Sequence, residues 1–173
     1  MASSSDDFID YRKAYPARSF DRERLKYEDE TAKIEAGVFD LTDYPIQQAL
    51  EGEPARRMNE HGTNKHLWVI ASESLPASLE ESQAGANLSR GRVCHTNLTG
   101  GEAAHCGGEL WFRDRASFWM NGGSGRYRPR SAEELEKIAA CFRSLGYSVC
   151  CFGWDDQTNK EKRYCRRGEE VWR

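Results

Sequence analysis

The chain has 173 residues, of which 38% are hydrophobic and 31% charged, and its net charge is -3. A domain of this length buries roughly 70% of its unfolded surface, so a hydrophobic core is expected. No apolar run approaches the ~20 residues of a membrane span, so we expect no membrane partner. The N-terminus lacks the basic start and apolar centre of a signal peptide. We therefore expect a cytoplasmic protein, or one delivered to a target cell without a cleavable signal peptide.

The first third of the chain carries weak helical signals. Residues 1–20 are mixed in character and begin with Ser and Asp, which predicts a flexible arm. Residues 21–62 are rich in Glu, Lys and Arg with few apolar anchors, which predicts a weakly amphipathic, helical N-terminal extension. Within it, Asp43 can cap a short helix and Pro45 suits its first turn. Residues 63–173 are expected to form the core domain.

Strand signals dominate the start of the core domain. The compact apolar run at residues 66–70 predicts an entry strand. Residues 72–89 have few large apolar side chains, which predicts a loop with at most a short helical turn. Three further strands are expected at residues 91–97, 108–113 and 117–121.

The strongest local signal is a helix that begins after Ser131. Ser131 and Glu134 form a capping box, and Gly146 supplies a C-terminal stop. A strand over residues 147–152 follows, with apolar residues on both faces as in a central position. These elements predict an α+β fold with a mainly antiparallel sheet and a β-β-β-α-β core. Apolar residues recur at helical spacing at Leu135, Ile138, Ala139, Phe142 and Leu145.

Two polar, glycine-rich clusters, at residues 94–101 and 121–127, lie in the basic half of the chain. Residues 1–86 carry 10 Lys and Arg against 17 Asp and Glu, whereas residues 87–173 carry 15 against 11. Strands commonly deliver such polar loops to one rim of a sheet. A basic rim is compatible with a phosphate-bearing or other anionic ligand, although a solvated basic face would have the same composition.

His95 and Glu109 are the candidate acid and base. An imidazole titrates near neutrality and can act in either role. Glu109 follows two glycines that let a ligand or another backbone approach closely, and it shares a strand face with Trp111. A carboxylate and an imidazole on neighbouring strands can divide the acid and base roles of hydrolysis or phosphodiester cleavage. A hydrogen-bonded structural His and a surface Glu paired with Arg are the alternatives.

The second cluster is the candidate anion-binding loop. Its glycines can expose successive backbone amides, and Arg126 adds an always-charged donor fork that would stabilise developing charge. The loop is not a Walker motif, and a tight turn before the helix would explain the glycines equally well. Tyr127 and Trp111 offer stacking surfaces for a base. The expected ligand-binding residues are Thr96, Asn97, Trp111, Gly122, Gly123, Ser124, Gly125 and Tyr127.

The six cysteines are expected to be reduced thiols that pack as small core residues. The sequence has no CxxC pair, which removes the strongest zinc and redox signatures. Cys94-His95 and His105-Cys106 carry zinc-ligand types, but adjacent residues of a strand point to opposite faces. We therefore expect no metal and no cofactor.

Residues 92–142 contain a His-led cluster, a Gly-Gly pair, a Gly-x-Leu strand and a Ser-Gly-x-Tyr-x-Pro turn. The residues of this pattern are His95, Thr96, Gly100, Gly101, Gly108, Leu110, Ser124, Gly125, Tyr127 and Pro129. The pattern resembles the C-terminal region of plant IQM-type calmodulin-binding proteins and similar bacterial effector or toxin-like domains. Arg126 stands where that pattern has His, and Glu109 where it is not acidic. The resemblance implies a common architecture and pocket.

Two functions from different classes follow. The first is a toxin- or effector-like enzyme, hydrolase or nuclease in type, that acts on a phosphate-bearing substrate such as RNA or a nucleotide. His95, Glu109 and Arg126 would carry its general acid/base chemistry. The alternative is a non-catalytic binding module, such as an immunity, adaptor or sensor protein, that recognises a small anion or a protein partner at the same rim.

Overall fold

The computed structural model describes residues 6–47, 64–163 and 170–173, and a six-stranded sheet lies at its centre. Neighbouring strands pair antiparallel, except that β5 and β6 are parallel. The expected α+β class with a mainly antiparallel sheet is confirmed in this form. In spatial order the strands are β1 (Phe39–Asp40), β3 (Pro76–Leu79), β2 (Lys65–Ile70), β4 (Cys106–Asp114), β5 (Ser117–Asn121) and β6 (Ser148–Cys151).

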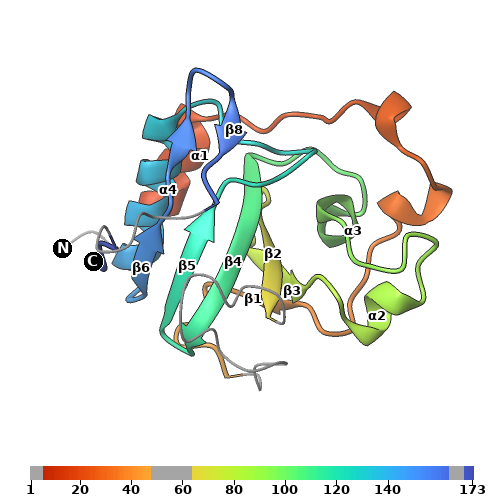
Figure 1. Ribbon diagram of the computed structural model, residues 1–173, viewed down its shortest axis with the longest axis horizontal. Helices are drawn as coiled ribbons and strands as arrows, with labels where there is room; N and C mark the ends of the chain where they lie inside the picture. The colour runs from red at the N-terminus through yellow and green to blue at the C-terminus, as the bar shows by residue number, and fades with distance from the viewer. Residues whose placement is uncertain (1–5, 48–63, 164–169) are drawn as a thin grey trace.

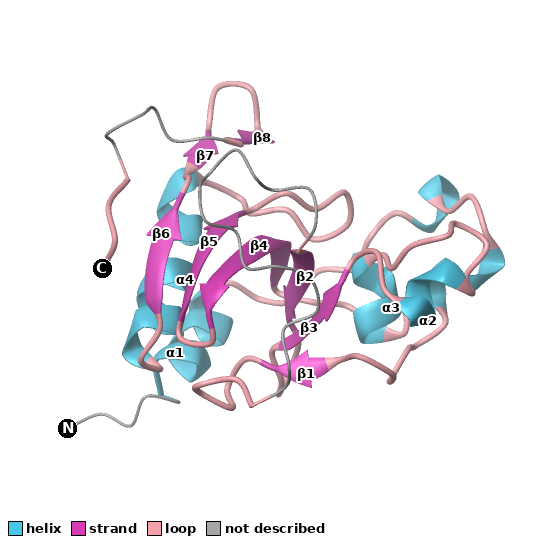
Figure 2. Ribbon diagram, turned by 60° about the horizontal axis from the view of Figure 1, so that its bottom comes forward, coloured by secondary structure: helices cyan, strands magenta, loops and turns pink. Residues whose placement is uncertain are grey.

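The helices lie at opposite ends of the molecule. Figure 1 shows α1 (Asp6–Ala14) beside α4 (Ala132–Ser144), next to β6, with α2 (Gln83–Ala86) and α3 (His95–Thr99) on the far side of β2. Figure 2 shows α1 and α4 behind the sheet. A small ribbon of β7 (Trp154–Asp155) and β8 (Lys160–Glu161) follows β6. Within the three described stretches, no helix is long and apolar enough to cross a membrane.

Alternating side chains of β2 build a core on each face of the sheet. Trp68 joins the larger core beneath α4, where its ring meets Phe142 edge to face at 5.8 Å. Leu67 and Val69 point the other way, into a smaller core that includes Leu98 of α3. On β4, the expected alternation is also present, because Leu110 and Phe112 face α4 while Trp111 lies in a separate aromatic cluster.

The predicted helix start at Ser131 is confirmed, since its hydroxyl accepts a hydrogen bond from the Glu134 amide at 3.1 Å. The Glu134 carboxylate, however, is fully buried and bonds outside the predicted capping box. It accepts from the Tyr11 hydroxyl at 2.7 Å and from the Arg130 guanidinium at 2.8 Å. A helix cap residue thus also fastens α1 to the core.

The N-terminal expectations need correction. Residues 1–20 are not simply a flexible arm, because α1 occupies residues 6–14 and buries Phe8 and Tyr11 against α4. The Phe8 ring packs edge to face on Phe142, and the Tyr11 hydroxyl donates to Glu134. In the predicted helical extension, the described residues 21–47 form no α-helix, only the short 3-10 turns η1 (Arg22–Arg24) and η2 (Glu28–Thr31) and the strand β1. Residues 48–62 of that prediction lie outside the described residues.

Two assignments in the core domain were also wrong, the loop at residues 72–89 and the strand at residues 91–97. Residues 72–89 contain β3 as well as the short helix α2, because Ala77 and its neighbours pair with β2 and β1. Residues 91–97 are not a strand: α3 begins at His95. The Asn97 side chain accepts from the Cys94 amide at 2.8 Å, and Gly100 closes the helix in the left-handed region at φ 65°. Local side-chain capping therefore overrode the strand pattern.

Replacing Ser131 with Ala removes the side-chain cap of α4. We expect the free energy of unfolding to fall by about 1 kcal/mol, measured by urea denaturation. Ser144→Ala is the matched control in the same helix, because the Ser144 hydroxyl only bonds back to the Cys141 carbonyl. It should be neutral or slightly stabilising. Equal losses in both variants would contradict the capping role.

Candidate functional site

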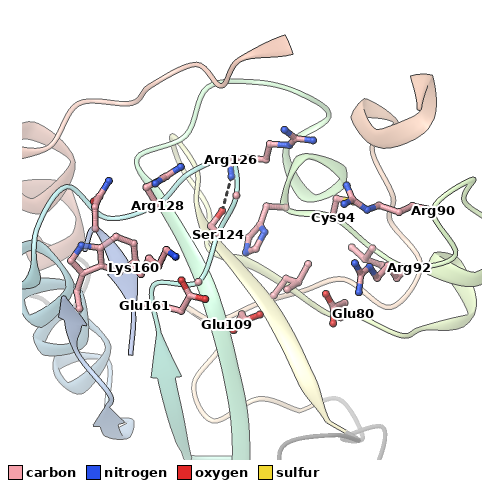
Figure 3. Close-up of a pocket in the computed structure, with 17 residues that line it drawn as sticks. Glu80, Arg90, Arg92, Cys94, Glu109, Ser124, Arg126, Arg128, Lys160 and Glu161 are labelled. Atoms are coloured by element: carbon pink, nitrogen blue, oxygen red, sulfur yellow. Dashed lines mark hydrogen bonds between the residues drawn. The ribbon is translucent and has the colours of Figure 1, made fainter. Parts of the chain in front are cut away.

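A cavity of about 380 Å³ lies where the N-terminal end of α3, strand β4, the glycine loop and the β7–β8 ribbon meet. Figure 3 shows that charged side chains converge on it from all of these elements. Of the residues predicted from the sequence, it brings together His95, Glu109, Gly123, Ser124, Gly125 and Arg126.

His95 lines this cavity in a defined tautomer. Its Nε2 lies 2.9 Å from the Gly108 carbonyl oxygen, which can only accept a hydrogen bond, so Nε2 carries the proton. Nδ1 has no partner among the described residues and bears the lone pair. Burial lowers the pKa of His95, although the hydrogen bond to Gly108 and the charge of Glu109 oppose this. The ring is therefore neutral, with a basic nitrogen, at pH 7.

Glu109 is held by two donors. Lys65 Nζ lies 3.1 Å from one carboxylate oxygen, and the Asn121 amide nitrogen lies 3.1 Å from the other. Lys65 also pairs with Glu80 at 2.7 Å, so one cation neutralises part of two carboxylates. Burial disfavours the charged Lys65, but its contacts with Glu80 and Glu109 outweigh this and raise its pKa. Glu109 is thus a fixed negative charge beside the cavity.

Arg126 is anchored by a buried carboxylate. Glu30 is 1% exposed, and it accepts from Arg126 at 2.8 Å and from Arg90 at 3.2 Å. Its other oxygen accepts from the backbone amides of Lys26 and Tyr27. Burial alone would raise the pKa of Glu30, but these hydrogen bonds and the nearby arginine charges lower it overall. Glu30 therefore fixes two arginines at the wall of the cavity.

Three further cations of the cavity have no carboxylate partner among the described residues: Arg92, Arg128 and Lys160. The three carboxylates that line it are already paired, since Glu80 and Glu109 contact Lys65, and Glu161 lies 3.3 Å from Arg163. In Figure 3 these cations stand on different sides of the cavity. The cavity therefore holds positive charge that its own carboxylates do not neutralise.

The glycine loop is a tight turn rather than an open row of amides. Ser124 Oγ accepts from the backbone amides of Arg126 at 3.3 Å and Tyr127 at 3.0 Å, and the Gly123 amide donates to Asn121 at 2.8 Å. Of the glycine amides expected to face a ligand, that of Gly123 is thus already used within the loop. A side chain at Gly123 would place its Cβ 2.8 Å from the Glu109 carboxylate, so the loop closes directly over that carboxylate.

Five of the expected ligand-binding residues do not line the cavity. The Thr96 hydroxyl donates to the Glu30 carbonyl, and the Asn97 amide donates to Asp29 and Ala32, so both tie α3 to η2. The Tyr127 hydroxyl donates to the Glu102 carbonyl at 2.6 Å within the smaller core. Gly122 packs against Pro129, and Trp111 lies in the aromatic cluster of β4, β5 and β6.

Sequence reasoning missed the residues that make the cavity basic. Arg90 and Arg92 precede α3, and Arg128 follows the glycine loop, so each lies next to a cluster that was identified. The density of arginines flanking both clusters was the available signal. No sequence pattern pointed to Glu30, because its partners Arg90 and Arg126 lie 60 and 96 residues away along the chain.

None of the five described cysteines forms a disulfide with another, in line with the expected thiols, and Cys106, Cys141 and Cys150 are buried. Within the described stretches, no group of three or more His, Cys, Asp and Glu side chains is arranged to hold a metal ion. No family model, curated protein or solved structure matches this chain. The resemblance of residues 92–142 to the plant proteins and bacterial domains therefore stays a hypothesis that rests on short motifs.

Glu30→Gln should leave Arg90 and Arg126 without their buried carboxylate partner. We expect the free energy of unfolding at pH 7 to fall by about 3 kcal/mol, as for a buried pair that loses one partner. Because the pKa of Glu30 is lowered on folding, its contribution is present above the ordinary value of 4.5 and disappears as the pH falls through the folded pKa. The variant should therefore lose less stability than the native protein as the pH falls below 4.5, measured by urea denaturation.

Glu133→Gln is the matched control for this experiment. Glu133 is an exposed carboxylate that pairs with Lys137 on the surface of α4, so its loss should cost less than about 0.5 kcal/mol. If Glu30→Gln behaves like Glu133→Gln at every pH, Glu30 does not organise the cavity wall.

Proposed function

We propose that this protein is an enzyme that acts on a phosphate-bearing substrate, RNA or a nucleotide, by general acid/base chemistry. The observation that carries the proposal is a neutral imidazole in a cavity that also holds cations without a carboxylate partner among the described residues. The Nδ1 of this imidazole has no hydrogen-bond partner among the described residues. The toxin- or effector-like class in this proposal rests on the resemblance of residues 92–142. The general acid/base chemistry rests on the residues that line the cavity.

The unpaired cations explain why a phosphate should bind. Arg92, Arg128 and Lys160 can each donate hydrogen bonds to a phosphate oxygen without first breaking an ion pair of the described residues. Arginine presents a planar donor fork that matches phosphate geometry, and lysine acts as a point charge. In a partly enclosed cavity these charges stabilise the negative charge that develops on a phosphoryl group more strongly than in water.

In this proposal, His95 acts as the general base. Its Nδ1 takes the proton of an attacking hydroxyl, whose oxygen forms the new bond to phosphorus while the bond from phosphorus to the leaving oxygen breaks. The leaving oxygen takes a proton from solvent, and the imidazolium later returns its proton to solvent. The Gly108 carbonyl holds the ring in the tautomer that this step requires. No titratable side chain other than His95 needs to change its charge.

Glu109 and Arg126 have supporting roles in this account. The fixed charge of Glu109 raises the pKa of His95 against the effect of burial, so it stabilises the imidazolium that the step forms. Arg126 uses one terminal nitrogen for both Glu30 and the Arg24 carbonyl, which leaves its remaining N–H groups without partners among the described residues. It can therefore contact a phosphate while staying fixed to Glu30.

His95→Ala should abolish turnover while leaving binding and folding nearly intact. The assays are cleavage of a labelled single-stranded RNA decamer and release of phosphate from ATP. His105→Ala is the matched control, since both histidines are 8% exposed but His105 bonds to the Tyr15 carbonyl outside the cavity. We expect at least a ~100-fold loss for His95→Ala, as for removal of a general base, and less than a ~3-fold loss for His105→Ala. Turnover retained in His95→Ala would refute the catalytic role.

The pH profile of the reaction gives a separate test. Because burial lowers the pKa of His95 below its ordinary value of 6.5, more than half of the base is deprotonated at pH 6.5. We expect the acidic limb of kcat/KM, where the imidazole is protonated, to be centred below pH 6.5. An acidic limb centred above pH 6.5 would identify another group as the base.

One observation favours the second candidate, a non-catalytic module that binds a small anion. Both oxygens of Glu109 are occupied by Lys65 and Asn121, so no free carboxylate stands beside His95 to serve as a second acid or base. A binding module would show thermal stabilisation by ATP or RNA without turnover of either, and this stabilisation would persist in His95→Ala.

A further inference from the structure

A second, smaller concavity of about 210 Å³ adjoins the first and is rich in arginine. Four of its lining residues are arginines: Arg18, Arg24, Arg126 and Arg128. Its only carboxylate is Asp21, whose side chain accepts from the Glu23 amide as the cap of η1. An anion in this concavity would therefore meet several guanidinium groups and one acid.

The two concavities share one wall. Gly125, Arg126 and Arg128 line both of them, so the end of the glycine loop is the ridge between them. Figure 3 shows Arg126 and Arg128 above the first cavity, on the side opposite Glu80 and Glu109. Arg90 and Arg92 line the first cavity from the α3 side. Arginines thus form a track that begins before α3, crosses the loop and ends at residues 18–24.

Most of these arginines are available to a ligand. The Arg24 and Arg128 side chains have no hydrogen-bond or ion-pair partner among the described residues, and Arg18 donates from one terminal nitrogen to the Arg128 carbonyl. Arg24 is exposed, while its backbone carbonyl accepts from Arg126 at 3.1 Å. The Arg24 side chain is therefore not needed for the contacts that hold Arg126.

The concavity offers charge but no stacking surface. Phe20 is its only aromatic residue and is 9% exposed. Arg22 and Arg126 lie over its ring at 5.5 and 5.9 Å, and Tyr127 meets it edge to face. A base could not stack on this ring, whereas a phosphate could reach the guanidinium groups around it. The site therefore suits a backbone phosphate rather than a nucleobase.

We infer that the substrate is a single-stranded RNA whose backbone crosses the Gly125–Arg128 ridge, with one phosphate at His95 and a neighbouring phosphate held by Arg18, Arg24 and Arg128. This inference rests on the proposed function and narrows its substrate class. A mononucleotide would occupy the first cavity alone. Because the contacts are to phosphates, binding depends weakly on base sequence and strongly on salt.

The test compares two ligands in two variants by fluorescence anisotropy. The ligands are a labelled 2′-O-methyl single-stranded RNA octamer and a labelled ATP. Arg24→Gln should weaken binding of the octamer about 5-fold and reduce the slope of log K against log salt by about 0.7, as for one lost phosphate contact on a single strand. The Kd for ATP should change less than 2-fold. Arg92→Gln should weaken binding of both ligands.

Arg115→Gln is the matched control. Arg115 is also exposed, its carbonyl also accepts a hydrogen bond, from the Ile46 amide, and it lines neither concavity. It should leave both Kd values unchanged. If Arg24→Gln matches Arg115→Gln while Arg92→Gln weakens both ligands, the second subsite is refuted and the proposed function survives. Equal weakening of both ligands by Arg24→Gln also refutes two subsites. If Arg92→Gln weakens neither, or neither ligand binds, the proposed function fails with it.

Discussion

The candidate site depends on the hydrogen bonds and ion pairs of the buried Glu30 carboxylate. This carboxylate is almost completely shielded from water, accepts hydrogen bonds from two backbone amides of its own segment and pairs with Arg90 and Arg126. A buried carboxylate is costly unless its oxygens are bonded, so the segment, the start of α3 and the glycine loop must assemble together. The hydroxyl of Thr96 donates to the Glu30 carbonyl and strengthens the same junction. One acid thus positions two arginines from distant parts of the chain.

The same arrangement explains why the cavity keeps positive charge. Lys65 occupies Glu80 and Glu109 on the sheet side, and Glu30 holds two arginines from behind. The remaining cations at the cavity and along the ridge lack such partners among the described residues. A bound anionic ligand would supply the negative charge that these cations lack within the protein, and the neutral His95 would lie beside that ligand. Burial lowers the pKa of His95, although the hydrogen bond to Gly108 and the charges of Glu109 and Glu80 oppose this effect.

Much of the fold, but less of the site, could be predicted from the sequence. Strands β2, β4 and β5 and the capped helix α4 follow their apolar periodicity, because each is buried along a whole face. Helix α3 escaped prediction because its capping by Asn97 and Gly100 outweighs a strand-like pattern. His95, Glu109 and Arg126 were brought to one cavity, but Thr96, Asn97 and Tyr127 were recruited by packing. Glu30 was invisible because its partners are remote in sequence.

The central claim is that His95 is a neutral base facing a phosphate site, and the ring nitrogens of this residue test it most directly. In a long-range ¹H–¹⁵N spectrum of the imidazole at pH 7, the account predicts the neutral tautomer with the proton on Nε2. It also predicts that inorganic phosphate shifts the Nδ1 resonance of the native protein. An imidazolium at pH 7, a proton on Nδ1, or a spectrum that phosphate leaves unchanged would contradict the account.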